Sequence, residues 1–244
     1  MKEILAKIEK GYANKRRGLP YTRYVSLNLG KPFSVFFYKL GVRPNWITFF
    51  SFLLALVAVL VLMGLGSGIK AGLLLLVLLQ LSYALDCSDG QVARLQGSSS
   101  PQGAWFDLLM DRVTGFMLIT GVLYWFWLQQ LFSDWASFFT VFIVCLFANT
   151  FFSYASNLKG LLLPASSAGQ ADKPGNWLKE LLFTPSDTGV FYLVLALTVC
   201  VPSWRLLFYY SCYKIIMLVL VMGSTLSGSK TKVGVKTENE RYSA

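Results

Sequence analysis

Residues 86–111 read DCSDGQVARLQGSSSPQGAWFDLLMD, and they lie between two stretches that are apolar enough to span a bilayer. Four aspartates fall within this segment. An aspartate at the centre of a membrane helix costs about 2.5–3.5 kcal/mol, so four would cost roughly 10 kcal/mol unless they lie near an interface or bind cations. We therefore expect the segment to lie near a membrane interface and the carboxylates to have a function.

The spacing of the aspartates favours a shared cation site. If both halves of the segment are helical, Asp86 and Asp89 are three residues apart and Asp107 and Asp111 are four apart, so each pair projects from one helix face. The chain contains no histidine, and carboxylate oxygens suit Mg²⁺, Mn²⁺ or Ca²⁺ rather than zinc or copper. Two facing pairs could hold two divalent ions.

The segment resembles the signature of a known enzyme family. It reads Asp86-x2-Asp89-Gly90-x2-Ala93-Arg94-x8-Gly103-x3-Asp107-x3-Asp111. At every fixed position this is similar to the CDP-alcohol phosphotransferases, integral membrane enzymes of phospholipid synthesis. A chance match of eight fixed residues is expected less than roughly once in a million chains of this size. A looser similarity extends to Pro44-Asn45-x2-Thr48 and to the number of helices.

The resemblance implies a reaction and a role for each matching residue. The hydroxyl of an alcohol acceptor attacks the β-phosphorus of a CDP-alcohol, CMP leaves, and a phosphodiester forms. Asp86, Asp89 and Asp107 would be the main ligands of two Mg²⁺ or Mn²⁺ ions. Asp111 would be the base that takes the acceptor proton, while also contacting a metal. The residues that would bind the nucleotide are Gly90, Ala93, Arg94, Gly103, Asn45 and Thr48.

Each of these positions also has an ordinary structural interpretation. Aspartates can form salt bridges or helix caps, and small residues in membrane helices often serve close packing. Asn45 and Thr48 can cap the helix that they open. Arg94 offers a planar fork to phosphate but also fits the basic flank of a membrane span. These alternatives remain open on the sequence alone.

The composition excludes several classes of protein. Of the 244 residues, 55% are hydrophobic and 14% are charged, which is too apolar for a typical soluble domain. The net charge is +10, but the basic residues form no nucleic-acid motif, so we expect contact with anionic lipid and no nucleic-acid partner. The four cysteines have no CxxC spacing and are expected to be small apolar fillers.

The apolar segments predict an all-α integral membrane protein with six transmembrane helices. The segments are residues 46–63, 71–85, 104–128, 135–154, 188–201 and 206–222. We expect the second and fifth to extend beyond these limits, because both are short for a span. The chain then divides into an interfacial N-terminal segment (1–43), a transmembrane catalytic domain (44–226) and a polar tail (227–244) that we expect to be disordered.

The distribution of lysine and arginine predicts the orientation. Ten basic residues lie between Lys2 and Arg43, and with an even number of spans the same side receives most of the others. The opposite side receives only Lys70 and Arg205. Because basic residues concentrate on the cytoplasmic side, we expect both termini and the four aspartates to face the cytoplasm.

Two apolar stripes before the first span predict amphipathic helices that lie in the interface. The first stripe is Ile4, Leu5 and Ile8, and the second is Phe33, Phe36, Phe37 and Leu40. Further along, residues 163–176 are rich in proline and glycine and are typical of a mobile linker or lid.

Three further basic residues bear on the acceptor. Arg112 follows the fourth aspartate, and Lys159 lies at the inner end of the fourth apolar segment, so either could bind an anionic acceptor; topology alone also explains Lys159. Lys214 lies eleven residues into the last apolar segment's helix, near mid-membrane. It is either functional or an ordinary lysine that snorkels or pairs with a carbonyl.

These features predict a membrane enzyme that transfers a phosphatidyl group from CDP-diacylglycerol to an alcohol, and the resemblance implies a homodimer. The acceptor stays open: glycerol phosphate, inositol phosphate and serine are all compatible. One alternative is the same chemistry with another CDP-linked donor. A cation transporter would instead require acidic residues through the membrane depth, and a silent scaffold would be expected to lack a metal ligand.

Overall fold

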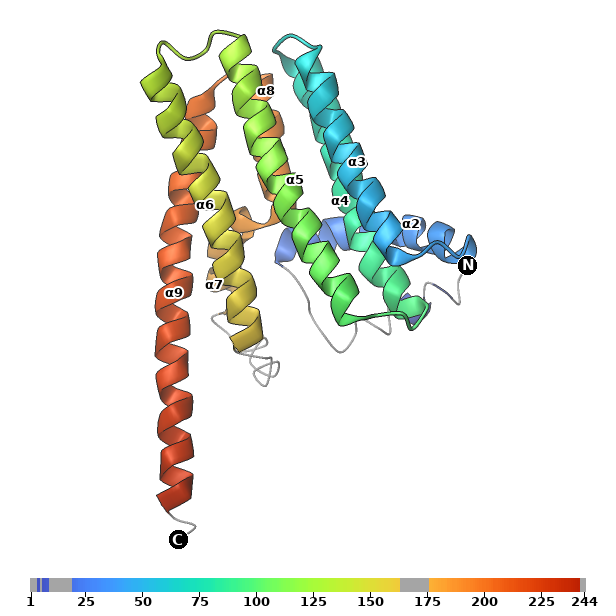
Figure 1. Ribbon diagram of the computed structural model, residues 1–244, viewed down its shortest axis with the longest axis vertical. Helices are drawn as coiled ribbons and strands as arrows, with labels where there is room; N and C mark the ends of the chain where they lie inside the picture. Colours follow the sequence, from blue (N-terminus) through green and yellow to red (C-terminus); the bar gives the residue numbers. More distant parts are fainter. Residues whose placement is uncertain (1–3, 5, 9–18, 163–175, 242–244) are drawn as a thin grey trace.

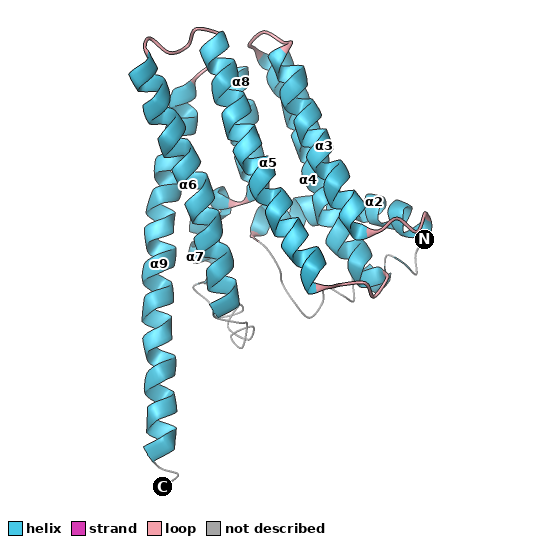
Figure 2. Ribbon diagram, in the orientation of Figure 1, coloured by secondary structure: helices cyan, strands magenta, loops and turns pink. Residues whose placement is uncertain are grey.

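The computed structural model describes residues 4, 6–8, 19–162 and 176–241, and within this part of the chain every regular element is helical (Figures 1 and 2). The longer helices are α2 (Leu27–Lys39), α3 (Pro44–Met63), α4 (Ile69–Leu95), α5 (Pro101–Leu128), α6 (Trp135–Leu162), α7 (Asn176–Phe183), α8 (Thr188–Cys200) and α9 (Trp204–Arg241). A π-helix, η1 (Thr22–Ser26), precedes α2, and a 3₁₀ turn, η3 (Thr184–Ser186), precedes α8. The predicted all-α fold is confirmed.

Helices α3, α4 and α5 run side by side, α8 packs against α4, and α6 packs against α9 (Figure 1). The α3–α4, α5–α6 and α8–α9 connections share one end of this bundle: the N–H of Gly68 donates to the carbonyl of Val199, and the Trp204 indole donates to the carbonyl of Leu131. The α4–α5 connection lies at the opposite end (Figure 1). The aspartate segment therefore occupies one end of the bundle.

Small residues let the helices approach closely. Ser51 of α3 and Ser82 of α4 each donate their hydroxyl to the other's backbone carbonyl, both at 2.9 Å. A Cβ at Gly121 would lie 2.5 Å from a Val59 methyl, and one at Gly72 would lie 2.2 Å from the Cys200 sulfur. Such small-residue contacts are the usual means of packing membrane helices, and here they fix the bundle that carries the site.

Large apolar side chains face outward along the bundle. Leu60, Ile143, Ile216 and Val219 are each at least 60% exposed, which is the expected surface for contact with lipid tails. In the described part of the chain, four helical segments are long and apolar enough to cross a membrane, namely Pro44–Met63, Ile69–Gln96, Trp135–Lys159 and Trp204–Leu226. The protein is an integral membrane protein.

The predicted number of six spans is not confirmed. A fifth is possible if the bent pair Glu180–Ser186 and Thr188–Cys200, which meet at 55°, forms one broken span. Helix α5 is 28 residues long, but it is not among the helices that qualify by length and composition together, because its first half carries Asp107, Asp111 and Arg112.

The segments outside the bundle bear on the remaining expectations. Helix α2 lies crosswise to the bundle (Figure 1) and is tied to α4, because Ser34 donates to the Gln91 amide oxygen at 2.8 Å. Residues 227–241, which we expected to be disordered, continue α9 instead; extending an existing helix adds one hydrogen bond for each residue fixed. Residues 163–175 of the predicted linker and Leu5 of the first amphipathic stripe lie outside the described residues, whereas Ile4 and Ile8 of that stripe are helical.

Candidate metal centre and its two cavities

A tight connection between α4 and α5 brings the aspartates together. Helix α4 ends at Leu95; Gly97, two residues later, has a φ of 63° that suits glycine, and the N–H of Ser98 donates back to the carbonyl of Ala93 at 2.9 Å. Helix α5 then starts with Pro101 in its first turn, and the Ser100 hydroxyl caps it by accepting from the N–H of Gly103 at 3.0 Å. The chain therefore reverses within a few residues, and the end of α4 meets the start of α5.

Three carboxylates converge at this point. Asp86, Asp89 and Asp107 each offer an oxygen, and these atoms all lie within 4.8 Å of one another. Among the described residues, none of the four aspartates of the signature forms an ion pair. Uncompensated carboxylates so close together, in a partly buried place, repel one another unless a cation lies between them. This donor set of oxygens fits a hard divalent ion such as Mg²⁺ or Mn²⁺.

Thr48 fixes one of these carboxylates. Its hydroxyl donates to Asp89 Oδ2 at 2.5 Å, and Asp89 is only 7% exposed. Helix α3 begins with Pro44 in its first turn and has no side-chain cap hydrogen bond at its N-cap, Arg43. The capping interpretation of Asn45 and Thr48 is therefore not what the structure shows, and Thr48 instead orients Asp89.

A cavity of about 620 Å³ opens beside the cluster, and we call it the larger cavity. Asp89 and Asp107 line it together with residues from the starts of α3 and α5, the end of α4 and the α4–α5 connection. All six residues predicted to bind the nucleotide line it: Asn45, Thr48, Gly90, Ala93, Arg94 and Gly103. The sequence did not single out Arg43, Trp46 and Ser98–Ser100, which also line this cavity.

Gly90 and Gly103 of the signature border open space and do not serve close packing against another helix. A Cβ at Gly90 would meet only the Arg94 guanidinium, at 3.5 Å or more, which is ordinary contact. At Gly103 the nearest atoms would be the Ser100 hydroxyl at 3.3 Å and the Asn45 amide oxygen at 3.5 Å. Neither glycine is pressed against another helix, so the close-packing interpretation does not apply to them.

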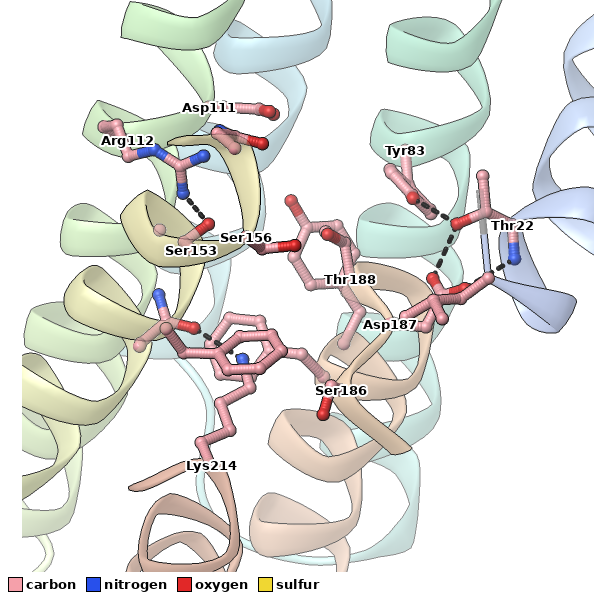
Figure 3. A pocket seen from close by; sticks show the side chains of 17 residues that line it. Thr22, Tyr83, Asp111, Arg112, Ser153, Ser156, Ser186, Asp187, Thr188 and Lys214 are labelled. Carbon is pink, nitrogen blue, oxygen red and sulfur yellow. Dashed lines mark hydrogen bonds between the residues drawn. The ribbon is translucent and has the colours of Figure 1, made fainter. Parts of the chain in front are cut away.

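A second cavity, of about 190 Å³, lies on the Asp111 side, and we call it the smaller cavity (Figure 3). Asp111 is one helical turn beyond Asp107, and its charge is close enough to interact with Asp86 and Asp107. The cavity is built from η1, α4, α5, α6, α8 and α9, and its polar lining includes Thr22, Asn149, Ser153, Asp187 and Thr188. Three of the four aspartates of the signature therefore line a cavity, Asp89 and Asp107 the larger one and Asp111 the smaller one.

Two cations line the smaller cavity. Arg112 donates to the Ser153 hydroxyl and lies over the Tyr154 ring (Figure 3). Lys214 is 4% exposed and donates to the Asn149 amide oxygen at 2.7 Å, with its Nζ 4.5 Å from the centre of the Phe191 ring. Lys214 does not snorkel to the surface; it pairs with a side-chain carbonyl inside the protein.

The two acceptor candidates from the sequence lie in different places. Arg112 lines the smaller cavity, but Lys159 lines neither cavity and donates instead to the Ser224 hydroxyl of α9 at 2.6 Å. The residues that the sequence interpretation missed come from distant parts of the chain, such as Thr22, Asn149 and Asp187. The one available signal was the unusual position of Lys214 within an apolar segment.

Comparison with known proteins agrees with this geometry. The family model described as CDP-alcohol phosphatidyltransferase matches residues 42–226. Phosphatidylinositol phosphate synthase of Corynebacterium glutamicum is 35% identical over 124 residues, which is 51% of this chain and 54% of that protein. The chain thus matches about half the length of this curated relative.

Solved structures show the same fold at low identity. Phosphatidylinositol phosphate synthase PgsA1 of Mycobacterium tuberculosis with CDP-DAG bound has a TM-score of 0.53 and 15% identity, covering 80% of this chain and 92% of that one. The same protein in complex with manganese and citrate gives a TM-score of 0.53 at 15% identity, over 81% and 88% of the two chains. The family model covers most of the chain, including all four aspartates of the signature. The protein therefore belongs to the CDP-alcohol phosphatidyltransferase family, the membrane transferases that the sequence of residues 86–111 predicted.

Proposed function

We propose that the protein transfers a phosphatidyl group from CDP-diacylglycerol to the hydroxyl of a small alcohol and releases CMP. One observation carries the proposal: the aspartates of the signature line two cavities, Asp89 and Asp107 the larger one and Asp111 the smaller one, and all six residues assigned to the nucleotide also line the larger cavity. Two separate cavities beside one set of carboxylates suit a reaction between a large donor and a small acceptor.

The larger cavity would bind the CDP part of the donor. Gly90 and Gly103 leave room for a flat base and its phosphates to approach the helix backbones, and Arg94 offers its guanidinium to phosphate oxygens. Asp86, Asp89 and Asp107 would hold two divalent cations, Mg²⁺ or Mn²⁺, which neutralise the diphosphate and the charge that develops on the leaving CMP.

The smaller cavity would bind the acceptor. Asp111, with Asp107 one turn away on the same helix, takes the proton of the acceptor hydroxyl. The acceptor oxygen forms a bond to the β-phosphorus as the bond between that phosphorus and the CMP oxygen breaks. Arg112 and Lys214 place positive charge in the same cavity, which favours an acceptor that carries an anionic group.

The proposal is tested with purified protein, CDP-diacylglycerol, Mg²⁺ or Mn²⁺, and a panel of glycerol 3-phosphate, inositol 1-phosphate and serine. Both CMP and the lipid product are measured. We expect CMP release that needs one of the acceptors and stops in excess chelator. CMP release that is equally fast in chelator would exclude the metal centre, and a second CDP-alcohol that is used faster would reassign the donor.

We also propose that the aspartate end of the bundle faces the cytoplasm, which the excess of lysine and arginine at that end supports. Single cysteines at Ser99 and Ser203, in a protein without its native cysteines, should react with an impermeant maleimide from opposite sides of the membrane. Labelling of Ser99→Cys from outside intact cells would place the site away from cytoplasmic CDP-lipids. A homodimer remains our expectation, and crosslinking in native membranes tests it.

A further inference from the structure

Residues that precede the first membrane span form one wall of the smaller cavity. Leu19 and Thr22 line the cavity, and Thr22 belongs to the π-helix η1. Both lie before residue 42, where the match to the family model begins. This wall is therefore a contribution of the N-terminal segment, outside the region that the family model matches.

Thr22 is held by a carboxylate from the other end of the chain. Its N–H donates to Asp187 Oδ2 at 2.8 Å, and its hydroxyl donates to Asp187 Oδ1 at 2.7 Å (Figure 3). The N–H of Gly189 also donates to Oδ1, at 3.1 Å. Asp187 is 2% exposed, and a buried carboxylate is tolerated only when such hydrogen bonds replace its water. Thr22 supplies two of the three.

The same hydroxyl connects the wall to the helix of the metal cluster. Tyr83 Oη lies 2.6 Å from Thr22 Oγ1. Because the Thr22 hydroxyl gives its hydrogen to Asp187, Tyr83 is the donor in this contact. Tyr83 lies on α4 three residues before Asp86. Two consecutive hydrogen bonds, from Tyr83 to Thr22 and from Thr22 to Asp187, thus join α4, η1 and the start of α8.

Neighbouring contacts hold the segment firmly. A Cβ at Gly189 would lie 2.2 Å from atoms of the Tyr21 ring, so this ring is packed directly on the backbone of α8. Arg23 forms an ion pair with Glu180 of α7 at 3.2 Å. The segment around Thr22 therefore has a defined position relative to the cavity that Asp111 also lines.

We propose that Thr22 is a positioning residue for the acceptor: by bonding Asp187 and Tyr83 it holds the N-terminal segment as the wall that keeps the acceptor beside Asp111. This inference rests on the proposed function. Among the described residues, none before Arg43 lines the larger cavity, so loss of the wall acts on the acceptor and leaves the donor site unchanged.

The test compares Thr22→Val, Thr22→Ser and a matched control, Thr140→Val. Valine keeps the shape of threonine but removes the hydroxyl, whereas serine keeps it. Thr140 is exposed on α6, and its hydroxyl bonds only within its own helix, to the carbonyl of Ala136. The KM values for CDP-diacylglycerol and for the best acceptor among glycerol 3-phosphate, inositol 1-phosphate and serine are measured in full-length protein, together with Tm.

We expect Thr22→Val to raise the acceptor KM about tenfold, as loss of a hydrogen bond to a charged group does, with the donor KM within about twofold of the unchanged protein. Thr22→Ser restores the acceptor KM, Tyr83→Phe shifts it in the same direction as Thr22→Val, and Thr140→Val leaves it unchanged. An unchanged acceptor KM in Thr22→Val, or equal rises in both KM values, overturns the inference. CMP release that needs no acceptor from the panel overturns the proposed function instead.

Discussion

The two cavities beside the aspartates are built in opposite ways. The larger cavity is lined by residues within 43–48 and 89–107, two short stretches that hold most of the recognisable signature. The smaller cavity draws its lining from Leu19 to Lys214, with residues from many helices. A motif search therefore finds the first cavity and passes over the second.

Their chemistry differs as well. The larger cavity gains its volume from small residues, since neither Gly90 nor Gly103 touches another helix closely. The smaller cavity is defined by charged groups: Arg112 and Lys214 on one side, and Asp187 bonded to Thr22 on another (Figure 3). The first arrangement admits a flat ligand, and the second selects by charge and hydrogen bonding. Four substitutions are expected to affect the two cavities differently.

The largest effect is expected at the carboxylate cluster, where Asp89 lines the larger cavity. Asp89→Asn keeps the side-chain volume but removes a ligand charge, so CMP release should fall about a thousandfold, equivalent to several kcal/mol of electrostatic stabilisation. Binding of Mn²⁺, measured by electron paramagnetic resonance, should weaken in parallel while Tm changes little.

The control is Asp134→Asn, because Asp134 caps the start of α6 at the other end of the bundle and its N-cap hydrogen bond from Ser137 explains its lowered pKa. Near-normal turnover by Asp89→Asn would mean that the carboxylate cluster takes no part in the reaction and does not connect the functions of the two cavities.

The next largest effect concerns the larger cavity alone. Gly90→Leu places a branched side chain in the space assigned to the nucleotide, so the KM for CDP-diacylglycerol should rise about a hundredfold, a value typical of a lost ligand contact of a few kcal/mol. The acceptor KM should stay within about twofold, and Tm should fall little, because a Cβ at this position meets only the Arg94 guanidinium, at 3.5 Å or more.

Gly121→Leu is the matched comparison, because a Cβ there would lie 2.5 Å from Val59. It should lower Tm strongly through overpacking between α3 and α5. If Gly90→Leu destabilises as much as Gly121→Leu while donor binding is unchanged, Gly90 serves packing and not the nucleotide.

A smaller effect is expected in the smaller cavity. Lys214→Met keeps the length of the chain but removes the charge, so the acceptor KM should rise about tenfold or somewhat more, with the donor KM unchanged. Because a buried charge costs desolvation, an apolar replacement among Phe152, Phe191 and Tyr210 should leave Tm equal or higher. Titration calorimetry with inositol 1-phosphate and glycerol 3-phosphate gives a second measure. A donor KM that rises with the acceptor KM would contradict the division of the site.

The smallest effect is expected at Lys159. Its Nζ donates to Ser224 away from both cavities, so Lys159→Met should change the acceptor KM by less than about twofold, in line with the small contribution of surface polar pairs. Lys159 was a candidate from sequence, and Lys214→Met is its natural counterpart in the same assay. A rise in acceptor KM for Lys159→Met that equals that of Lys214→Met would mean that the acceptor lies nearer the end of α6 than the smaller cavity does.

Features that depend on adjacent residues could be predicted from the sequence, whereas features that depend on residues far apart in the chain could not. Helix α4 with its Gly97 turn and α5 with its Ser100 cap follow from adjacent residues, so the pairing of Asp89 with Asp107 could be predicted from the spacing alone. The position of Lys214 was recognised as unusual, but its partner Asn149 is 65 residues away. The periodicity of a sequence does not predict a contact between residues so far apart. The predicted number of six spans is not confirmed for a related reason: α5 is 28 residues long, but its charged residues keep it from qualifying as a span by composition.

The sequence by itself determined the chemistry of the signature: the oxygen ligands, the small residues beside them and the apolar helices that carry both, because helical spacing and composition act over a few turns. Only the tertiary structure decided what faces Asp111. Thr22 and Asp187 are 165 residues apart, and Arg112 and Lys214 approach the same cavity from α5 and α9. Those contacts depend on how η1, α8 and α9 pack around α4 and α5, and helix packing is set by side chains on several helices at once.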